Sequence, residues 1–295
     1  MPARRASAGS VFLLTDFGTA DEFAGVIRAV VLREAPGCPV VDITHEIPPF
    51  DVRAGALALE RAVPHLGPGV VVAVVDPGVG TDRRAVAVKA ASGSGPGYLV
   101  GPDNGLLGFA LEALGGATGT VALHPATWGP GTGATFDGRD VFAPAAARLW
   151  SDTRLEDLGV PIDSDTLVRL AAPRLEVQPG VIQAEVLWVD RFGNVQLAAR
   201  PADAVVAGLG TEPVVITGRA TAVARRETSF AASQGAAVVP GPAVEPDAAR
   251  GDAVGLIADS NGHLALVCRR RSAATVLGVQ AGDMVIVRNG ERAGP

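Results

Sequence analysis

The sequence has little cysteine and few aromatic side chains. Its 295 residues include only two cysteines, Cys38 and Cys268, which lie far apart in the chain. Two such cysteines make neither a disulfide framework nor a metal cluster, so we interpret them as small buried apolar residues. Aromatic residues make up 4% of the chain, which leaves little surface for stacking on nucleic-acid bases.

Positive charge and long apolar runs are also scarce. The formal net charge is −6, and an acidic protein is a poor partner for nucleic acid or for an anionic membrane surface. No apolar run approaches the ~18 residues of a membrane span, and residues 1–10 lack the apolar core of a secretion signal. The four histidines show no metal-ligand spacing. The sequence predicts a cytoplasmic protein with a loose N-terminus at residues 1–10 and no bound metal.

Strands and helices alternate in the first half of the chain. The apolar runs at 11–15, 38–44 and 69–75 have the length of buried strands, and the segments 21–37 and 51–66 between them have helical spacing. Such alternation is typical of parallel strands joined by helical crossovers. We therefore expect an α/β N-terminal domain with a mainly parallel sheet at residues 11–172.

The pattern changes after about residue 180. Short stretches that alternate apolar and polar residues, such as "VDRFGNVQL" and "DMVIVRNG", are separated by Gly, Asp and Asn. This pattern predicts an all-β, barrel-like C-terminal domain at residues 178–295. The segment 155–173 is rich in turn residues, and we interpret it as a linker.

Carboxylates follow the predicted strands of the first domain. In α/β sheets, ligands bind at the carboxyl ends of the strands, and Asp16 and Asp76 follow two of those strands. An Asp at such a place can also cap a helix or form a turn. Asp76 differs because it ends the apolar run "VVVAVV", where a partly desolvated carboxylate needs a partner. Arg83 and Arg84 are the nearest candidates in the sequence.

Six motifs occur together in a fixed order. They are "LLTDFGTADEFAG", "VVDITHEIPPFDVRAGALAL", "VVDPGVGTDRRAVAV", "GPDNGLL", "TFDGRDVFAPAAA" and "VDRFGNVQL". Through them, the chain from about residue 11 to 288 resembles the S-adenosyl-L-methionine (SAM) hydrolases. These proteins are also called SAM hydroxide adenosyltransferases, and they are related to the fluorinase and the chlorinase.

The resemblance implies an activity and an assembly. The implied reaction is hydrolysis of SAM to adenosine and L-methionine, in which an activated water attacks the ribose 5′-carbon in line with the leaving group. No cofactor is implied. The implied assembly is a homotrimer, with each substrate between the N-terminal domain of one subunit and the C-terminal domain of its neighbour.

The resemblance also assigns roles to individual residues. Asp76 and Arg83 match the family's water-activating pair, and Asp16 matches the residue that binds the ribose hydroxyls. The remaining matches are substrate contacts: Asp21 and Asp190 at the methionine end, Phe192 and Asn194 at the adenine, Ser260 at the substrate's amino acid, and Arg269 in the adenine loop.

Asp137 departs from the family pattern. The hydrolases usually have "TFHGRD", whose His completes an Asp–Arg–His set around the water, and the halogenases have a Tyr-Ser pair there. Three interpretations remain open. Asp137 can replace the His as the water's hydrogen-bond acceptor; the site can bind SAM or a nucleoside with little catalysis; or Asp137 can cap the following helix while Arg139 and Asp140 pair.

Two further positions bear on specificity. The halogenases have a Tyr at the position of Asp76, and its absence favours a hydrolase over a chlorinase-like halide adenosyltransferase. Arg269 and Arg271 occupy places where the family has Asn and Gly, in a loop whose backbone meets adenine. Loss of glycine restricts close backbone approach, so the base specificity stays open.

Overall fold

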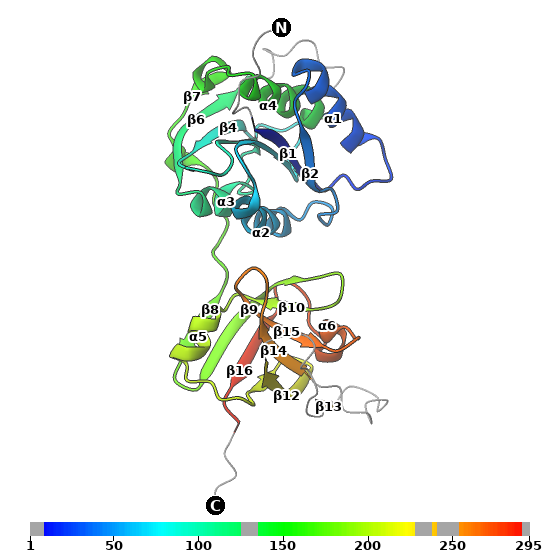
Figure 1. Cartoon of the computed structure of the whole chain (residues 1–295), viewed down its shortest axis with the longest axis vertical. Helices are drawn as coiled ribbons and strands as arrows, with labels where there is room; N and C mark the ends of the chain where they lie inside the picture. The colour runs from blue at the N-terminus through cyan, green and yellow to red at the C-terminus, as the bar shows by residue number, and fades with distance from the viewer. Residues whose placement is uncertain (1–8, 125–134, 228–237, 241–253, 291–295) are drawn as a thin grey trace, which may run out of the picture. The chain divides into compact units, whose positions relative to one another are not determined.

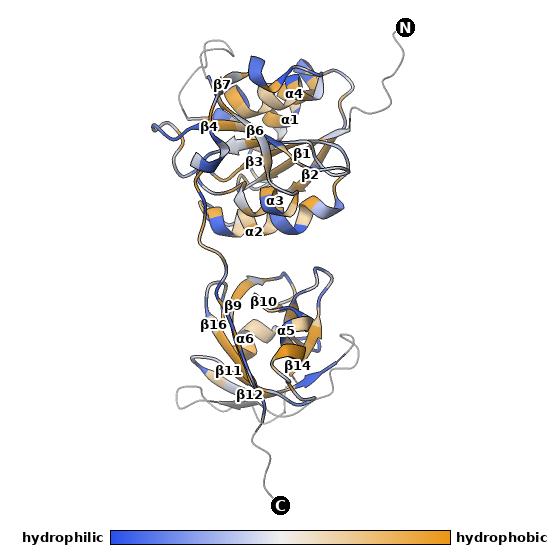
Figure 2. Cartoon of the chain, turned by 90° about the vertical axis from the view of Figure 1, so that its left-hand side faces the viewer, coloured by the Kyte–Doolittle hydropathy of each residue, from blue (hydrophilic) through white to orange (hydrophobic). Residues whose placement is uncertain are grey.

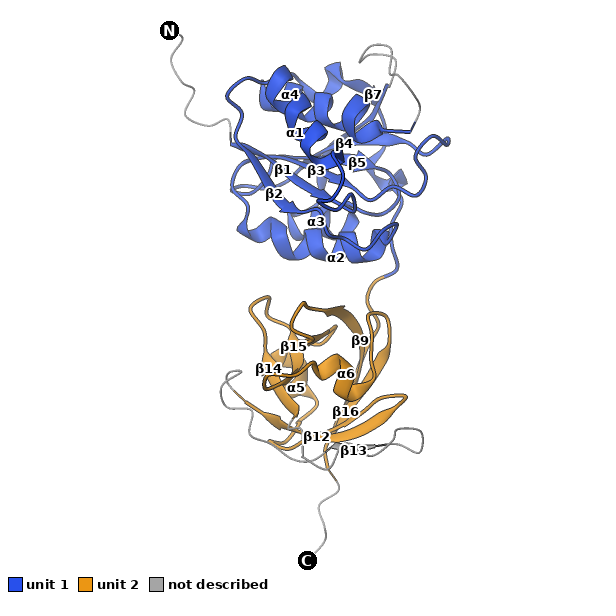
Figure 3. Cartoon of the chain, turned by 90° about the vertical axis from the view of Figure 1, so that its right-hand side faces the viewer, with its two compact units in different colours: residues 1–171 blue, residues 172–295 orange. Residues whose placement is uncertain are grey.

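The chain folds into two compact units. The computed structural model describes residues 9–124, 135–227, 238–240 and 254–290. The units are Met1–Ala171 and Ala172–Pro295 (Figure 3). Most of the N-terminal segment expected to be loose, residues 1–10, lies outside the described residues. Among the described residues, no helix is both long and apolar enough to cross a membrane.

The first unit contains a mixed β-sheet. Its described strands lie in the order β2-β1-β3-β5-β4-β6-β7. Strands β2, β1, β3 and β5 are parallel, whereas the β5–β4, β4–β6 and β6–β7 pairs are antiparallel. The strand bounds are β1 Ser10–Thr15, β2 Val40–Thr44, β3 Gly69–Val74, β4 Ala85–Ala90, β5 Tyr98–Pro102, β6 Ala117–Leu123 and β7 Gly159–Pro161.

The expected α/β fold of this unit is confirmed, with the parallel pairing confined to one half of the sheet. The reason is local. Helices connect β1 to β2 and β2 to β3, and such crossovers place strands in parallel. Strands β4 and β5 are instead joined by a loop of residues 91–97, and a short connection of this kind joins antiparallel neighbours.

Helices cover both faces of this sheet. Helices α1 and α4 pack against each other on one face, and α2 and α3 pack on the other (Figure 1). Helix α1 turns a stripe that includes Ile27 and Val31 into the core, as its helical spacing predicts. The bounds are α1 Phe23–Glu34, α2 Val52–Ala62, α3 Gly108–Ala113 and α4 Ala143–Trp150, with a π-helical turn at Gly138–Phe142 and 3-10 turns at Val63–His65, Leu155–Asp157 and Ser164–Thr166.

The second unit is a closed β-barrel, as the sequence predicts. The ring runs β10-β15-β14-β12-β11-β16-β9 and closes where β9 pairs with β10, while β8 and β13 extend it. Apolar residues concentrate on the strands of both units (Figure 2). The bounds are β8 Leu175–Gln178, β9 Val181–Val189, β10 Val195–Leu197, β11 Val214–Ile216, β12 Ala220–Arg226, β13 Val238–Pro240, β14 Val254–Ala258, β15 Leu264–Cys268 and β16 Met284–Arg288, with helices α5 Pro201–Val206 and α6 Ala273–Leu277.

The turn-rich segment after α4, expected as a linker, is largely part of the first unit. Strand β7 pairs with β6. Arg84 Nε donates to Asp103 at 2.7 Å, and its Nη1 donates to the Thr166 hydroxyl at 3.0 Å. The backbone N–H of Val168 also donates to Asp103, at 2.8 Å. Asp103 is buried, so these bonds fasten the segment to the sheet.

Replacing Asp103 tests this anchor. Asp103→Ala removes a buried acceptor from a charged donor and from a backbone N–H. We expect the free energy of unfolding to fall by about 2 to 3 kcal/mol, measured by urea denaturation followed by circular dichroism. The matched control is Asp165→Ala, since Asp165 is 92% exposed; its effect should stay within about 0.5 kcal/mol. Equal effects of the two substitutions would contradict the anchor.

Candidate active site

A cavity of about 580 Å³ lies in the first unit, beyond the ends of β1 and β3. Those strands end at Thr15 and Val74, so Asp16 and Asp76 stand just past their carboxyl ends. Ligands bind at this edge in α/β sheets. The lining residues are Asp16, Phe17, Phe23, Pro49, Phe50, Val74, Asp76, Val79, Thr135, Phe136, Asp137, Gly138 and Arg139.

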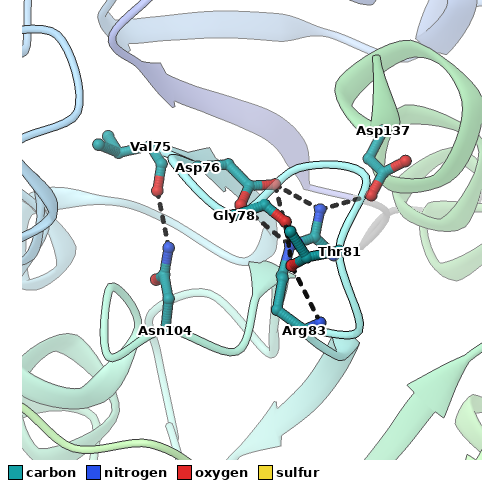
Figure 4. A network of polar contacts seen from close by, with 7 residues as sticks. All are labelled: Val75, Asp76, Gly78, Thr81, Arg83, Asn104 and Asp137. Atoms are coloured by element: carbon teal, nitrogen blue, oxygen red, sulfur yellow. Dashed lines mark hydrogen bonds and ion pairs between the residues drawn. The ribbon is translucent and has the colours of Figure 1, made fainter. Parts of the chain in front are cut away.

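Arg83 lies between two carboxylates beside this cavity (Figure 4). Its Nε donates to both oxygens of Asp76 at 3.0 Å, and its Nη2 bonds one oxygen of Asp76 and one of Asp137. The side chains of Asp76, Arg83 and Asp137 are 6%, 12% and 21% exposed. Burial lowers the pKa of Arg83, because it disfavours the charged guanidinium. The hydrogen bonds and charges of Asp76 and Asp137 outweigh this effect and raise the pKa above its usual value. Arg83 therefore stays charged.

The loop after β3 directs Arg83 toward Asp76. The Thr81 hydroxyl donates to the Gly78 carbonyl at 2.6 Å and accepts from the Arg83 N–H at 3.4 Å. On the other side, the Asn104 amide donates to the Val75 carbonyl at 2.9 Å and so holds the residue that precedes Asp76 (Figure 4). Arg84 pairs with Asp103 instead, so of the two arginines expected as partners of Asp76, Arg83 is the partner.

Asp137 stands at the start of the π-helical turn that leads into α4. Among the described residues, its side chain makes no capping hydrogen bond, so the interpretation of Asp137 as a helix cap is wrong. Its carboxylate bonds Arg83 instead, because the turn lies against the β3 loop. Arg139 does pair with Asp140, at 2.7 Å from Nε. Gly138 lets the turn lie close to α1, because a Cβ there would lie 2.9 Å from Ile27 Cδ1.

Phenylalanine rings form one wall of the cavity. The rings of Phe17, Phe23 and Phe136 meet edge to face, with centroids 5.3 to 5.9 Å apart. Together with Phe50, four of the eight phenylalanines in the described part of the chain line this one cavity. Of these four, Phe23 and Phe50 are 40% and 71% exposed, and a patch of exposed apolar surface at a cavity marks a contact with a ligand or partner. The sequence reasoning missed this wall, although the scarcity of aromatic residues made each of them informative.

Asp16 holds the loop that carries Phe50. Its carboxylate accepts the Phe50 backbone N–H at 2.9 Å. Phe50 has φ 67°, a left-handed conformation that is costly for a bulky residue, and the residue is 71% exposed. The hydrogen bond stabilises a strained residue at the rim. Asp21, by contrast, is exposed and is not among the described residues that line the cavity.

The second unit has its own cavity, of about 820 Å³. It brings together four of the substrate contacts that the resemblance implies: Asp190, Phe192, Asn194 and Arg269. Residues 270–272 and Cys268 complete the lining. Ser260 lies elsewhere, exposed on the turn between β14 and β15, and is not among the described residues that line this cavity.

Asp190 organises the rim of this second cavity. Its carboxylate accepts the backbone N–H of Phe192 at 2.8 Å, that of Asn194 at 2.9 Å, and the Asn194 side-chain amide at 2.7 Å. The turn leaves Phe192 78% exposed. Gly193 has φ 82°, and a Cβ there would lie 2.2 Å from the Ser272 hydroxyl. Glycine is therefore required where this turn meets Ser272, the residue after the three arginines at 269–271.

Family models match both units. The model described as the SAM hydroxide adenosyltransferase N-terminal domain matches residues 11–159, and that of the C-terminal domain matches residues 184–286. A Salinispora tropica protein named (R)-S-adenosyl-L-methionine hydrolase is 43% identical over 277 residues, which cover 94% of this chain and 96% of that protein.

More distant relatives extend the comparison. A fluorinase from an Actinoplanes species is 27% identical over 226 residues, 68% of this chain and 74% of that protein. Among solved structures, an uncharacterized conserved protein from Thermotoga maritima has a TM-score of 0.82 at 29% identity, covering 95% of this chain and 100% of that one. A conserved hypothetical protein from Thermus thermophilus has a TM-score of 0.68 at 36% identity, covering 95% of this chain and 99% of that one.

The Asp190 turn yields a stability prediction. Asp190→Ala leaves three donors without their acceptor, so we expect a loss of about 1 to 3 kcal/mol in the free energy of unfolding, seen as a lower thermal midpoint in calorimetry. Glu176→Gln, on the exposed face of β8, is the control and should leave the midpoint unchanged. An unchanged midpoint for Asp190→Ala would mean that this carboxylate does not hold the turn.

Proposed function

The chain belongs to the SAM hydroxide adenosyltransferase family, a family of enzymes, and on that premise we propose that it hydrolyses SAM to adenosine and L-methionine. The single observation that carries the proposal is the Asp76–Arg83–Asp137 group, held rigidly beside a cavity of about 580 Å³. Relatives named as SAM hydrolases support it, the Salinispora tropica protein over nearly the whole chain.

Hydrolysis of SAM depends more on the position of the attacking water than on acid catalysis. The water oxygen attacks the ribose 5′-carbon, the C–S bond breaks, and its electron pair goes to the sulfur. Methionine leaves as a neutral thioether, so no general acid is required, and the scheme uses no cofactor or metal. The lost proton goes to a carboxylate and then to solvent. What the site must supply is a water aligned with the C–S bond and a base for its proton.

We assign Asp76 as the general base and Arg83 as the group that aims it. The side chain of Asp76 is 6% exposed, and hydrogen bonds from Nε and Nη2 of Arg83 restrict its carboxylate to one orientation. Asp137 supplies a second carboxylate on the other side of the same guanidinium. In this proposal Asp137 acts where the family has its His, as a second hydrogen-bond acceptor for the water.

The cavity walls suit the substrate. Aromatic faces attract cations, and the ring wall of Phe17, Phe23 and Phe136 offers such faces to the sulfonium and apolar surface to the nucleoside. Asp16 is proposed to bind the ribose hydroxyls, beside the Phe50 loop that it holds. A chlorinase-like activity is less favoured, because Asp76 stands where the halogenases have a Tyr.

The assembly is part of the proposal. We propose a cytoplasmic homotrimer in which the cavity of the first unit is completed by the second unit of a neighbouring subunit. Phe192, Asn194 and Arg269 are then proposed to contact the adenine. Asp21, Asp190 and Ser260 are assigned to the methionine end by the resemblance alone, and Asp190 acts there through the turn that it holds.

Removing the proposed base tests the mechanism. Asp76→Asn keeps the shape of the side chain but takes away its basicity, so adenosine formation from SAM should fall by about 10²- to 10⁴-fold, measured by chromatography of the products. Asp82→Asn, an exposed residue of the same loop, should keep the full rate. Full activity in Asp76→Asn would sink the mechanism. If the unaltered protein releases no product while it still binds SAM, it is a binding protein.

Mixing two inactive variants tests the shared site. One carries Asp76→Asn in the first unit, and the other carries Phe192→Ala with Arg269→Ala in the second. If sites form between subunits of a trimer, a random one-to-one mixture, unfolded and refolded together, should regain about a quarter of the wild-type sites. Each variant refolded alone is the control. A mixture no more active than the two variants refolded separately would rule out sites shared between subunits.

A further inference from the structure

The cavity of the first unit presents negative charge. Three carboxylates line it, those of Asp16, Asp76 and Asp137, while Arg83 is not among the described residues of its lining. The Nε and Nη2 of Arg83 are directed at Asp76 and Asp137. Arg139 does line the cavity, but its Nε and Nη2 both donate to Asp140 at 2.7 Å. The guanidinium charges at this cavity are therefore engaged by carboxylates.

The two carboxylates around Arg83 are close enough for one water to bridge them. Both bond the same nitrogen, Nη2, so ordinary bond lengths place the two oxygens no more than about 6 Å apart. A water that donates one hydrogen to each carboxylate spans about 4 to 5 Å, because each O–H···O⁻ bond is about 2.7 Å long and the two hydrogens diverge at about 105°. This span lies within the limit set by Nη2.

We propose that Asp137 is a specificity-determining residue that selects a neutral, proton-bearing nucleophile and keeps halide ions out. This inference rests on the proposed hydrolysis and extends it to the choice of nucleophile. An ionised carboxylate only accepts hydrogen bonds. Water can satisfy Asp76 and Asp137 together with its two hydrogens. A chloride ion has no hydrogen to donate and is repelled by both carboxylates.

Replacing Asp137 changes the hydrogen-bonding groups that this site offers. In Asp137→Ala, Nη2 of Arg83 loses its bond to Asp137 and keeps the one to Asp76, so a charged donor becomes available toward the cavity. In Asp137→Asn, the amide oxygen can keep the bond to Arg83 while the amide N–H groups become donors. Both variants replace an acceptor-only site with one that can donate to an anion.

Chloride binding tests this inference without any turnover. The line width of ³⁵Cl in nuclear magnetic resonance is followed as chloride is titrated into the wild-type protein, Asp137→Ala, Asp137→Asn and the exposed control Asp165→Asn. We expect the wild type to match the control, and both Asp137 variants to bind chloride at least about tenfold more tightly. Asp137→Asn is close in shape to the natural residue and serves if the alanine variant does not fold.

Product analysis forms the second arm. SAM is incubated with each protein in sodium chloride or sodium gluconate at an ionic strength of about 0.15 M. The wild-type rate of adenosine formation should be the same in both salts, whereas chloride should slow the Asp137 variants or yield 5′-chloro-5′-deoxyadenosine. Chloride binding or chlorination by the wild type, or variants that gain no chloride affinity, would overturn the inference. Failure of the wild type to release adenosine would instead count against the proposed hydrolysis, and the titration would still test Asp137.

Discussion

The ion pair between Asp76 and Arg83 is the constraint around which the first unit's cavity is built. A carboxylate at the end of the buried strand β3 is costly to bury unless a cation pairs with it. The loop after β3 turns back through Thr81 and places Arg83 against Asp76. Asp137 then joins from a different element, so the β3 loop and the turn before α4 are held by one guanidinium.

The parallel half of the mixed sheet forms the cavity, and the antiparallel half anchors the segment after α4. In the parallel half, β1 and β3 are neighbours, which puts Asp16 and Asp76 on the same edge and opens the cavity there. In the antiparallel half, Asp103 and Arg84 fasten the segment that leads toward the second unit. The two adjacent arginines that precede β4 thus have different partners: Arg83 pairs with Asp76 and Arg84 with Asp103.

Carboxylates in this protein shape backbone as much as they face ligands. Asp16 holds Phe50 in a left-handed conformation, and Asp190 holds the turn that exposes Phe192. In both places an aspartate accepts the backbone N–H of an exposed phenylalanine at the rim of a cavity. A backbone held in advance loses less conformational entropy when a ligand covers the ring that it carries. The few aromatic residues of this chain are therefore presented to a ligand at little entropic cost.

The sequence by itself determined the two-part architecture, because hydrophobic periodicity is a local property that survives folding: an α/β unit followed by a barrel is confirmed. It also identified Asp76 as a carboxylate that needs a partner, from its place after "VVVAVV". Tertiary structure alone decided that the partner is Arg83 rather than Arg84, and that Asp137 bonds Arg83 across 54 positions of sequence rather than capping its own helix. Both outcomes depend on which segments meet in space, and local patterns carry no information about such long-range contacts.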